Sequence, residues 1–172
     1  MTKLEKLYEI ASKKEIIIRF YNLRDFGVMG LNVHKENMPY MIFLDYTVKN
    51  NPLIHLETLA HELGHYFTLV GNLMEPSNYT EQLQTNKYEN KAEKWACEFL
   101  ITENEIIELI NSKTTCVYEM AEKLEVNVDI LHKRLEYLSR QKQILDLGND
   151  KYLVLTNLPN FYIFDYSIKF DL

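Results

Sequence analysis

The sequence predicts an α+β protein with a short antiparallel sheet, a helical segment of helix–turn–helix type and a C-terminal β-hairpin. Three observations lead to this class. Apolar residues recur at helical spacing in several windows, between shorter runs of strand-forming residues. Thr2 with Glu5, and Thr102 with Glu105, form capping boxes that mark helix starts. Apolar and polar residues alternate on both sides of Gly148, which is typical of a hairpin.

Composition and charge narrow the function classes. The chain has 172 residues, 47% of them hydrophobic, with five glycines and four prolines, which is typical of a compact globule. A formal net charge of −6 argues against a non-specific nucleic-acid binder, which would be basic. The amino terminus is mixed and charged, and no apolar run approaches the length of a membrane span. We therefore expect a cytoplasmic protein whose two cysteines, Cys97 and Cys116, are reduced.

The first elements are expected to be a helix and three strands. The capping box at Thr2 opens a helix whose shared apolar face consists of Leu4, Leu7, Tyr8 and Ala11. Residues 15–20 then have the composition of a strand. Residues 27–33 and 40–46 are predicted to form a hairpin whose turn lies at residues 35–39.

A second helix is predicted to begin at Pro52. Asn51 can cap this helix, and proline suits the first helical position because no helical partner is lost there. Gly64 lies in the helix interior, where glycine costs roughly 1 kcal/mol. We therefore expect another backbone or a substrate to come close at Gly64. The apolar stripe for the core consists of Leu53, Leu56, Ala60, Leu63 and Phe67.

Residues 61–65 of this helix are His-Glu-Leu-Gly-His, on a face different from the apolar stripe. Residues four apart on a helix share a face, so His61 and His65 can present ring nitrogens to a single ion. Glu62 projects beside them, within reach of a water molecule at that ion. This pattern indicates a zinc-dependent, zincin-like peptidase. The alternative is a pair of surface histidines on an ordinary helix.

A hydrolytic zinc site takes three protein ligands, and candidates for the third lie on a predicted helix over residues 88–101. Glu89 and Glu93 share a stripe that otherwise suits the core, and buried carboxylates need a partner such as a cation. We expect Glu89 to be the ligand and Glu93 to accept a hydrogen bond from a ligating histidine. The reverse assignment and two solvated carboxylates are the alternatives. Cys97 is expected to pack in the core, with a thiolate ligand as its alternative.

The segment 69–87 between these helices is polar and rich in turn formers. A connection of this length is often functional. Tyr79 and Tyr88 lie in or beside it, and either could donate a hydrogen bond to a developing oxyanion. Ordinary packing remains our expectation for both.

The second half opens with the helix capped by Thr102 and continues with a helix–turn–helix-like pattern over residues 117–144. Such a pattern suggests DNA reading, but a DNA-facing helix pair should be basic. Here the acidic residues are Glu119, Glu122, Glu125, Asp129 and Glu136, and the basic residues are Lys123, Lys133, Arg134, Arg140 and Lys142. We interpret the segment as structural or partner-binding.

The C-terminal part is expected to be a β-hairpin of residues 143–147 and 151–155. The aromatic tail from Asn157 onwards is expected to pack as a last strand or to bind a partner. We place a metallopeptidase core at residues 1–112, and the helical segment with the hairpin at residues 113–172, packed on the core.

The two predicted ligand helices together resemble a known family. A His-Glu-Leu-Gly-His helix followed by a Glu-x-x-Ala-x-x-x-Ala helix is similar to the ImmA/IrrE metallopeptidases of bacteria, phages and integrative elements. In that family the second helix typically reads Glu-x-x-Ala-Asn-x-Phe-Ala. Here Glu93 replaces the asparagine and Trp95 the phenylalanine, which puts the second-shell role of Glu93 in question. The resemblance covers roughly residues 1–138.

The resemblance implies a zinc ion held by His61, His65 and Glu89, with Glu62 as the general base. Manganese or iron could fill the same ligands. The implied substrate is a protein, a helix–turn–helix repressor that is cleaved to derepress phage, mobile-element or stress genes. The strand at 40–46, or a neighbour, is expected to pair with the extended substrate backbone if it lies at a sheet edge.

Two other functions remain as alternatives. The first is a metal-binding regulatory module that binds a repressor without cleaving it, and the presence of Glu62 argues against it. The second is a transcription factor that uses residues 117–155. We expect no membrane partner and no direct nucleic-acid binding.

Overall fold

The structure is a computed structural model that describes residues 1–68 and 79–166, with side chains left undescribed at residues 79–84. Its internal contacts divide the chain into two compact units, Met1–Leu100 and Ile101–Leu172. The expected functional boundary near residue 112 stays a prediction, because compactness alone does not test it.

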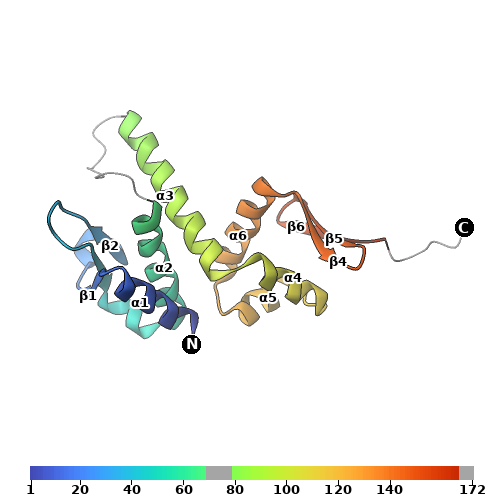
Figure 1. Cartoon of the computed structure of the whole chain (residues 1–172), viewed down its shortest axis with the longest axis horizontal. Helices are drawn as coiled ribbons and strands as arrows, with labels where there is room; N and C mark the ends of the chain where they lie inside the picture. Colours follow the sequence, from blue (N-terminus) through green and yellow to red (C-terminus); the bar gives the residue numbers. More distant parts are fainter. Residues whose placement is uncertain (69–78, 167–172) are drawn as a thin grey trace, which may run out of the picture. The chain divides into compact units, whose positions relative to one another are not determined.

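The first unit contains helices on one side of a small sheet (Figure 1). Its elements are α1 (Lys3–Lys13), β1 (Ile17–Tyr21), η1 (Arg24–Phe26), β2 (Gly30–Val33), β3 (Met41–Asp45), η2 (Tyr46–Asn50), α2 (Pro52–Thr68) and α3 (Tyr79–Leu100). The capping box of Thr2 and Glu5 is formed, as predicted. The α+β class is therefore confirmed, and the first strands and helices lie close to their expected positions.

The sheet of the first unit has the strand order β1-β3-β2. β2 and β3 form the expected antiparallel hairpin. The expected antiparallel pairing is wrong for β1, which runs parallel to β3, because β3 inserts between β1 and β2. As a consequence β3 is the central strand, and β2 lies at an edge of this sheet.

The register of the hairpin decides which side chains of β2 face the helices. Gly30 lies opposite Leu44 and Asn32 lies opposite Ile42. Leu44 and Ile42 are fully buried, so they mark the covered face of the sheet. Because side chains alternate along a strand, Gly30 and Asn32 both lie on this covered face.

α2 begins as predicted, with the Asn51 side chain accepting hydrogen bonds from the N–H groups of Leu53 and Ile54. The predicted stripe is buried at its centre, but it is wrong at Phe67, which is exposed. Phe67 instead stacks on Trp95 of α3, with ring centroids 4.8 Å apart. A period of 3.6 residues gives the direction of a side chain, whereas burial also depends on what covers it.

α2 and α3 pack directly against each other (Figure 1). A Cβ placed on Gly64 would lie 2.9 Å from the carbonyl carbon of Ala92 and 3.0 Å from its Cα. The expectation that another backbone comes close at Gly64 is therefore confirmed. Ala92 and Ala96 are buried, as small residues at a close helix contact should be.

The second unit contains a group of helices followed by a sheet. Its elements are α4 (Glu103–Asn111), α5 (Val117–Leu124), α6 (Val128–Gln141), β4 (Ile144–Gly148), β5 (Lys151–Asn157) and β6 (Asn160–Asp165). The capping box of Thr102 and Glu105 is formed. β4 and β5 make the expected hairpin, and β6 adds a third antiparallel strand. The tail thus supplies a last strand that ends at Asp165, and the aromatic residues Tyr162, Phe164 and Tyr166 are more than half exposed.

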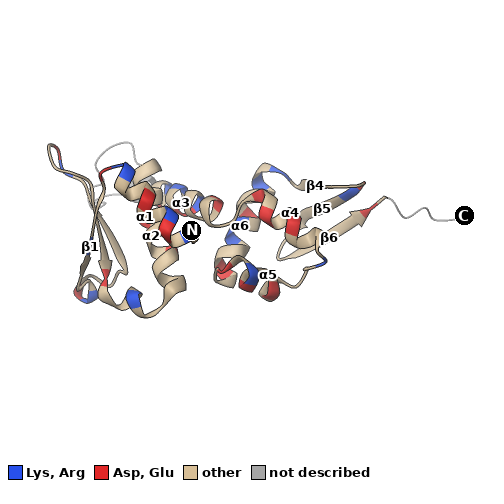
Figure 2. Ribbon diagram, turned by 60° about the horizontal axis from the view of Figure 1, so that its bottom comes forward, with Lys and Arg blue, Asp and Glu red and all other residues tan. Residues whose placement is uncertain are grey.

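Lys and Arg residues are interspersed with Asp and Glu residues on the helices of this second unit (Figure 2). Some of these residues form ion pairs within one helix, four positions apart. Lys123 pairs with Glu119 on α5, and Arg140 pairs with Glu136 on α6. α5 and α6 therefore carry no continuous basic face of the kind that DNA binding needs. Among the described residues, no helix has the length and hydropathy to cross a membrane.

Candidate metal centre

Two histidines of α2 converge one helical turn apart. The Nε2 atoms of His61 and His65 are 3.1 Å apart, and the two rings lie nearly perpendicular to each other. The His65 side chain is 9% exposed and that of His61 is 33% exposed. This arrangement follows from the i, i+4 spacing, which places both side chains on the same helix face.

Glu89 of α3 completes a group of three. Its Oε2 atom lies 3.3 Å from Nε2 of His61 and 3.5 Å from Nε2 of His65. One ligand atom from each residue therefore falls within a sphere suited to a metal ion. Tetrahedral zinc with ligand distances of about 2.0–2.2 Å needs ligand atoms about 3.3–3.6 Å apart. The two separations to Glu89 fall within this range, and the 3.1 Å between the histidine nitrogens is slightly shorter. The nitrogen and oxygen donors are also those that zinc takes, so the residues present suit such an ion.

The charges in this group are strongly coupled. Hydrogen bonds from His61 and His65 hold the pKa of Glu89 well below its usual range. Burial alone would lower the pKa of His61, but its hydrogen bond to Glu89 and the nearby carboxylates outweigh burial and raise it. The three side chains therefore stabilise a positive charge placed among them, which can be a proton on an imidazole or a metal cation.

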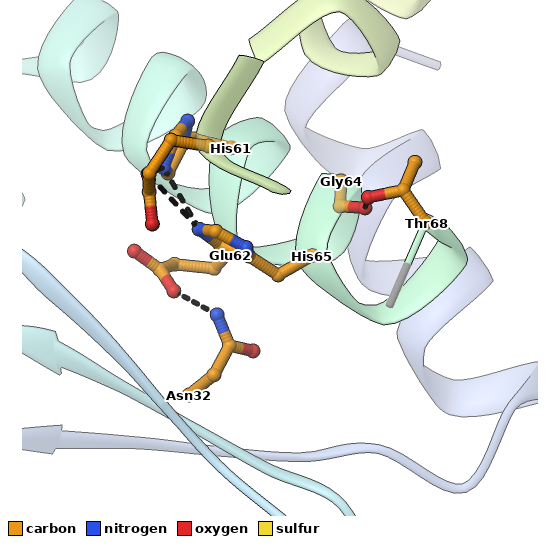
Figure 3. A network of polar contacts seen from close by, with 7 residues as sticks. Asn32, His61, Glu62, Gly64, His65 and Thr68 are labelled. Carbon is orange, nitrogen blue, oxygen red and sulfur yellow. Dashed lines mark hydrogen bonds and ion pairs between the residues drawn. The ribbon is translucent and has the colours of Figure 1, made fainter. Parts of the chain in front are cut away.

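Glu62 lies beside this group but faces the sheet. Its side chain is buried, and its Oε2 accepts a hydrogen bond from Nδ2 of Asn32 in β2 (Figure 3). A Cβ placed on Gly30 would lie 2.7 Å from the Glu62 Cδ, so the carboxylate occupies the space that a side chain at position 30 would take. Burial raises the pKa of Glu62 to about 7, against the opposing effect of the two histidines. A carboxylate with such a pKa can both take and release a proton near neutral pH.

The charge of Glu93 acts on His61. Burial lowers the pKa of His61, and Glu93 is one of the carboxylates whose charge raises it, after Glu62 and Glu89. Nδ1 of His65 is buried and has no hydrogen-bond partner in the described part of the chain, so the hydrogen bond expected from a ligating histidine to Glu93 is not made by His65. A hydrogen bond from His61 to Glu93 stays a prediction.

Three further residues of the sequence analysis can be placed. Cys97 is buried in the core and lies outside the group of three. Tyr88 is half-buried, with the Lys91 ammonium 5.7 Å from its ring centroid. The Tyr79 side chain lies outside the described residues, as does most of the segment 69–87. An oxyanion role for either tyrosine stays a prediction.

Sequence reasoning missed the contribution of the sheet. Asn32 and Gly30 contact Glu62, and Tyr40 has a buried hydroxyl without a hydrogen-bond partner. Burial, followed by the charge of Glu62, raises the pKa of Tyr40. The sequence did hold a signal for this contribution. Gly30 and Asn32 are two residues apart, so they share one face of the strand, and a small and a polar residue on the covered face of a strand indicate a contact with a functional group.

An α+β unit in which two histidines and a glutamate meet beside a buried second glutamate has the arrangement of a metal-dependent peptidase. The sequence model of the M78 peptidases, described as the IrrE N-terminal-like domain, matches residues 12–136. The chain belongs to this family of peptidases. A search of curated proteins finds no match to it.

Proposed function

We propose that the protein is a zinc-dependent endopeptidase. The observation that carries this proposal is the fit of three donor atoms, from His61, His65 and Glu89, to the edges of a tetrahedral metal site. A metal-dependent hydrolase also needs a proton acceptor beside the ion, and the buried Glu62 lies in that position. Membership of a peptidase family supports the same chemistry.

In this proposal His61, His65 and Glu89 would hold the ion. A zinc ion bound there would lower the pKa of water towards about 7 and polarise a carbonyl group. Glu62 would take a proton from the attacking water and then deliver it to the leaving amine. Its burial supports this double role, because burial favours the protonated form that the carboxyl group must reach before it can deliver the proton.

The sheet has two edge strands, β1 and β2, and β2 is the one that contacts Glu62. The strand expected at 40–46 is β3, which is interior, so it cannot pair with a further chain. Its neighbour β2 is at the edge of the sheet and touches Glu62 through Asn32. A substrate backbone added along β2 would run next to the metal centre, with side chains alternating between the two faces.

The substrate that we propose is a helix–turn–helix transcriptional repressor, cleaved to derepress phage, mobile-element or stress genes. This choice rests on the family resemblance rather than on a residue of the chain. Such a substrate is met in the cytoplasm, which agrees with the location expected from the sequence.

The experiment compares cells that express the wild type, Glu62→Gln or Glu57→Gln and identifies new protein amino termini by mass spectrometry. Glu57 lies on the same helix outside the group of three, so its variant controls for the loss of one carboxylate. We expect a new terminus within a repressor for the wild type and Glu57→Gln, and none for Glu62→Gln. Binding of the repressor to the purified wild type and Glu62→Gln is measured alongside. If both proteins bind the repressor equally and neither cuts it, the result favours the interaction module that does not cleave.

A further inference from the structure

We propose that Asn32 is a positioning residue that holds the Glu62 carboxylate in place, with Gly30 providing the space for it. The inference rests on the proposed function, since it concerns the proton acceptor of the same site. It assigns a role to β2 beyond that of a surface for substrate pairing.

Gly30 and Asn32 are two residues apart in β2, so both lie beneath α2 on the covered face of the sheet. The Asn32 amide donates to Oε2 of Glu62, while Oε1 and the Glu62 side-chain carbons lie over the missing Cβ of Gly30. The two positions therefore bound the carboxylate from two directions. Figure 3 shows one carboxylate oxygen on Asn32 and the other turned toward the side of His61.

The two polar atoms of the Asn32 side chain differ in their hydrogen bonding. Its Nδ2 donates to Glu62, whereas its Oδ1 is buried and has no hydrogen-bond partner among the residues that the structure describes. Leaving a buried acceptor unsatisfied costs stability, and such groups concentrate where function requires them. An asparagine that served packing alone would gain nothing from this arrangement, because an apolar residue would fill the position without the unsatisfied oxygen.

Without the Asn32 donor, the Glu62 carboxylate would keep its packing over Gly30, but Gly30 has no side chain to give it a hydrogen bond, so the direction of its oxygens would no longer be fixed from β2. A general base acts only when it lies within hydrogen-bond reach of the proton that it takes. Small misplacements of catalytic groups carry large rate penalties. Loss of Asn32 should therefore lower turnover while the metal ligands, on other elements, stay in place.

Two substitutions test this role. Asn32→Ala removes the amide, and Asn32→Asp keeps its shape while replacing the donor with an acceptor. Asn22→Asp is the matched control, since it makes the same change of charge at an exposed position in the same unit. Glu62→Gln serves as the reference for loss of the carboxylate. Thermal unfolding and zinc content identify any variant that fails through misfolding rather than through misplacement of Glu62.

The first readout is the affinity of the zinc-loaded protein for acetohydroxamic acid, measured by calorimetry. On chelating the metal ion this acid would lose its hydroxyl proton, and a carboxylate in the position of Glu62 would take it up, so the affinity reports the position of Glu62 without a peptide substrate. We expect Asn32→Ala and Asn32→Asp to bind it at least about tenfold more weakly, approaching Glu62→Gln, with zinc content unchanged and Asn22→Asp equal to the wild type. The tenfold value corresponds to about 1.4 kcal/mol.

The second readout is the division between kcat and KM on the repressor identified as above. We expect a fall in kcat of about tenfold or more with KM nearly unchanged, because positioning of the base acts on the reaction step. Weak acetohydroxamate binding by Glu62→Gln together with normal binding by both Asn32 variants would overturn the positioning role and leave the proposed function standing. A wild type that takes up no zinc would overturn the proposed function, and the positioning role would fall with it.

Discussion

Gly64 of α2 lies against the main chain of Ala92 in α3, so closely that a Cβ at position 64 would stand 2.9 Å from the Ala92 carbonyl carbon. His61 and His65 belong to the same two turns of α2, and Glu89 lies one turn before Ala92 on α3. The spacing of the proposed ligands therefore depends on a contact between two backbones. Within α2, the hydroxyl of Thr68 also donates to the Gly64 carbonyl oxygen (Figure 3).

We expect Gly64→Ala to weaken metal binding and to destabilise the protein. Alanine is the better helix former by about 1 kcal/mol, but overpacking against a backbone costs about 1–3 kcal/mol, because a carbonyl group cannot turn aside like a side chain. The measurement is zinc affinity by competition with a chelator, together with unfolding in urea. Lys91→Ala, which removes an exposed side chain of α3 beside Ala92, is the control. Equal affinity and stability of both variants would contradict the prediction.

Metal content should show which of the two candidate ligands on α3, Glu89 or Glu93, holds the ion. By mass spectrometry of the purified protein, we expect about one zinc per chain for the wild type and for Glu93→Ala, and little for Glu89→Ala. Glu89 has an oxygen within 3.5 Å of both histidine nitrogens, and the group of three that could hold a metal ion includes Glu89 and not Glu93. If Glu93→Ala loses its zinc and Glu89→Ala retains it, the third ligand is Glu93, one turn further along α3.

Asp45 should give the protein a stability that depends on pH. Its buried carboxylate accepts hydrogen bonds from the Thr47 hydroxyl and the N–H groups of Thr47 and Leu23, which lower its pKa. The folded pKa is below the unfolded value of about 3.9. The stabilisation is therefore complete above about pH 5 and is lost as the pH falls through the folded pKa.

Asp45→Asn should accordingly unfold at a lower urea concentration than the wild type at pH 7, with a difference that shrinks toward pH 3. Urea unfolding at several pH values measures this difference. Asp25→Asn, at an exposed position of η1, is the matched control and should show no such trend. A difference between Asp45→Asn and the wild type that stays constant with pH would show that the carboxylate is not charged in these bonds.

The capping box of α4 should stabilise the second unit. The hydroxyl of Thr102 accepts a hydrogen bond from the Glu105 N–H at 3.2 Å, and Glu105 accepts one in return from the Thr102 N–H. Thr102→Ala should cost about 1 kcal/mol of unfolding free energy, whereas Thr102→Ser keeps the cap and should cost only a fraction of it. Chemical unfolding followed by circular dichroism measures both. Equal losses for the two variants would indicate that the methyl group, and not the cap, is responsible.

The sequence predicts best those features that local interactions determine. The start of α2 at Pro52 and both capping boxes follow from residues within one turn of each other, and the structure has them where they were expected. The meeting of His61, His65 and Glu89 was also predictable, because helical spacing places the two histidines on one face and a zinc site takes a third ligand. The burial expected of the Glu89 carboxylate is wrong, since its side chain is 50% exposed.

Features that depend on how separate elements meet could not be predicted in the same way. The parallel pairing of β1 with β3 depends on which strand is central, which the spacing of apolar residues does not encode. The contact of Asn32 with Glu62 depends on the register of β2 below α2. The exposure of Phe67 similarly reflects what covers α2 rather than its periodicity.

The division of the three donor residues between α2 and α3 has a thermodynamic consequence. A cation held by His61, His65 and Glu89 would cross-link two helices that the chain itself connects only through a long intervening segment. A cation that binds the folded protein and not the unfolded chain would stabilise the folded state, so metal occupancy would be joined to folding. The concentration of available metal in the cell would then set both the activity of this protein and its lifetime against proteolysis.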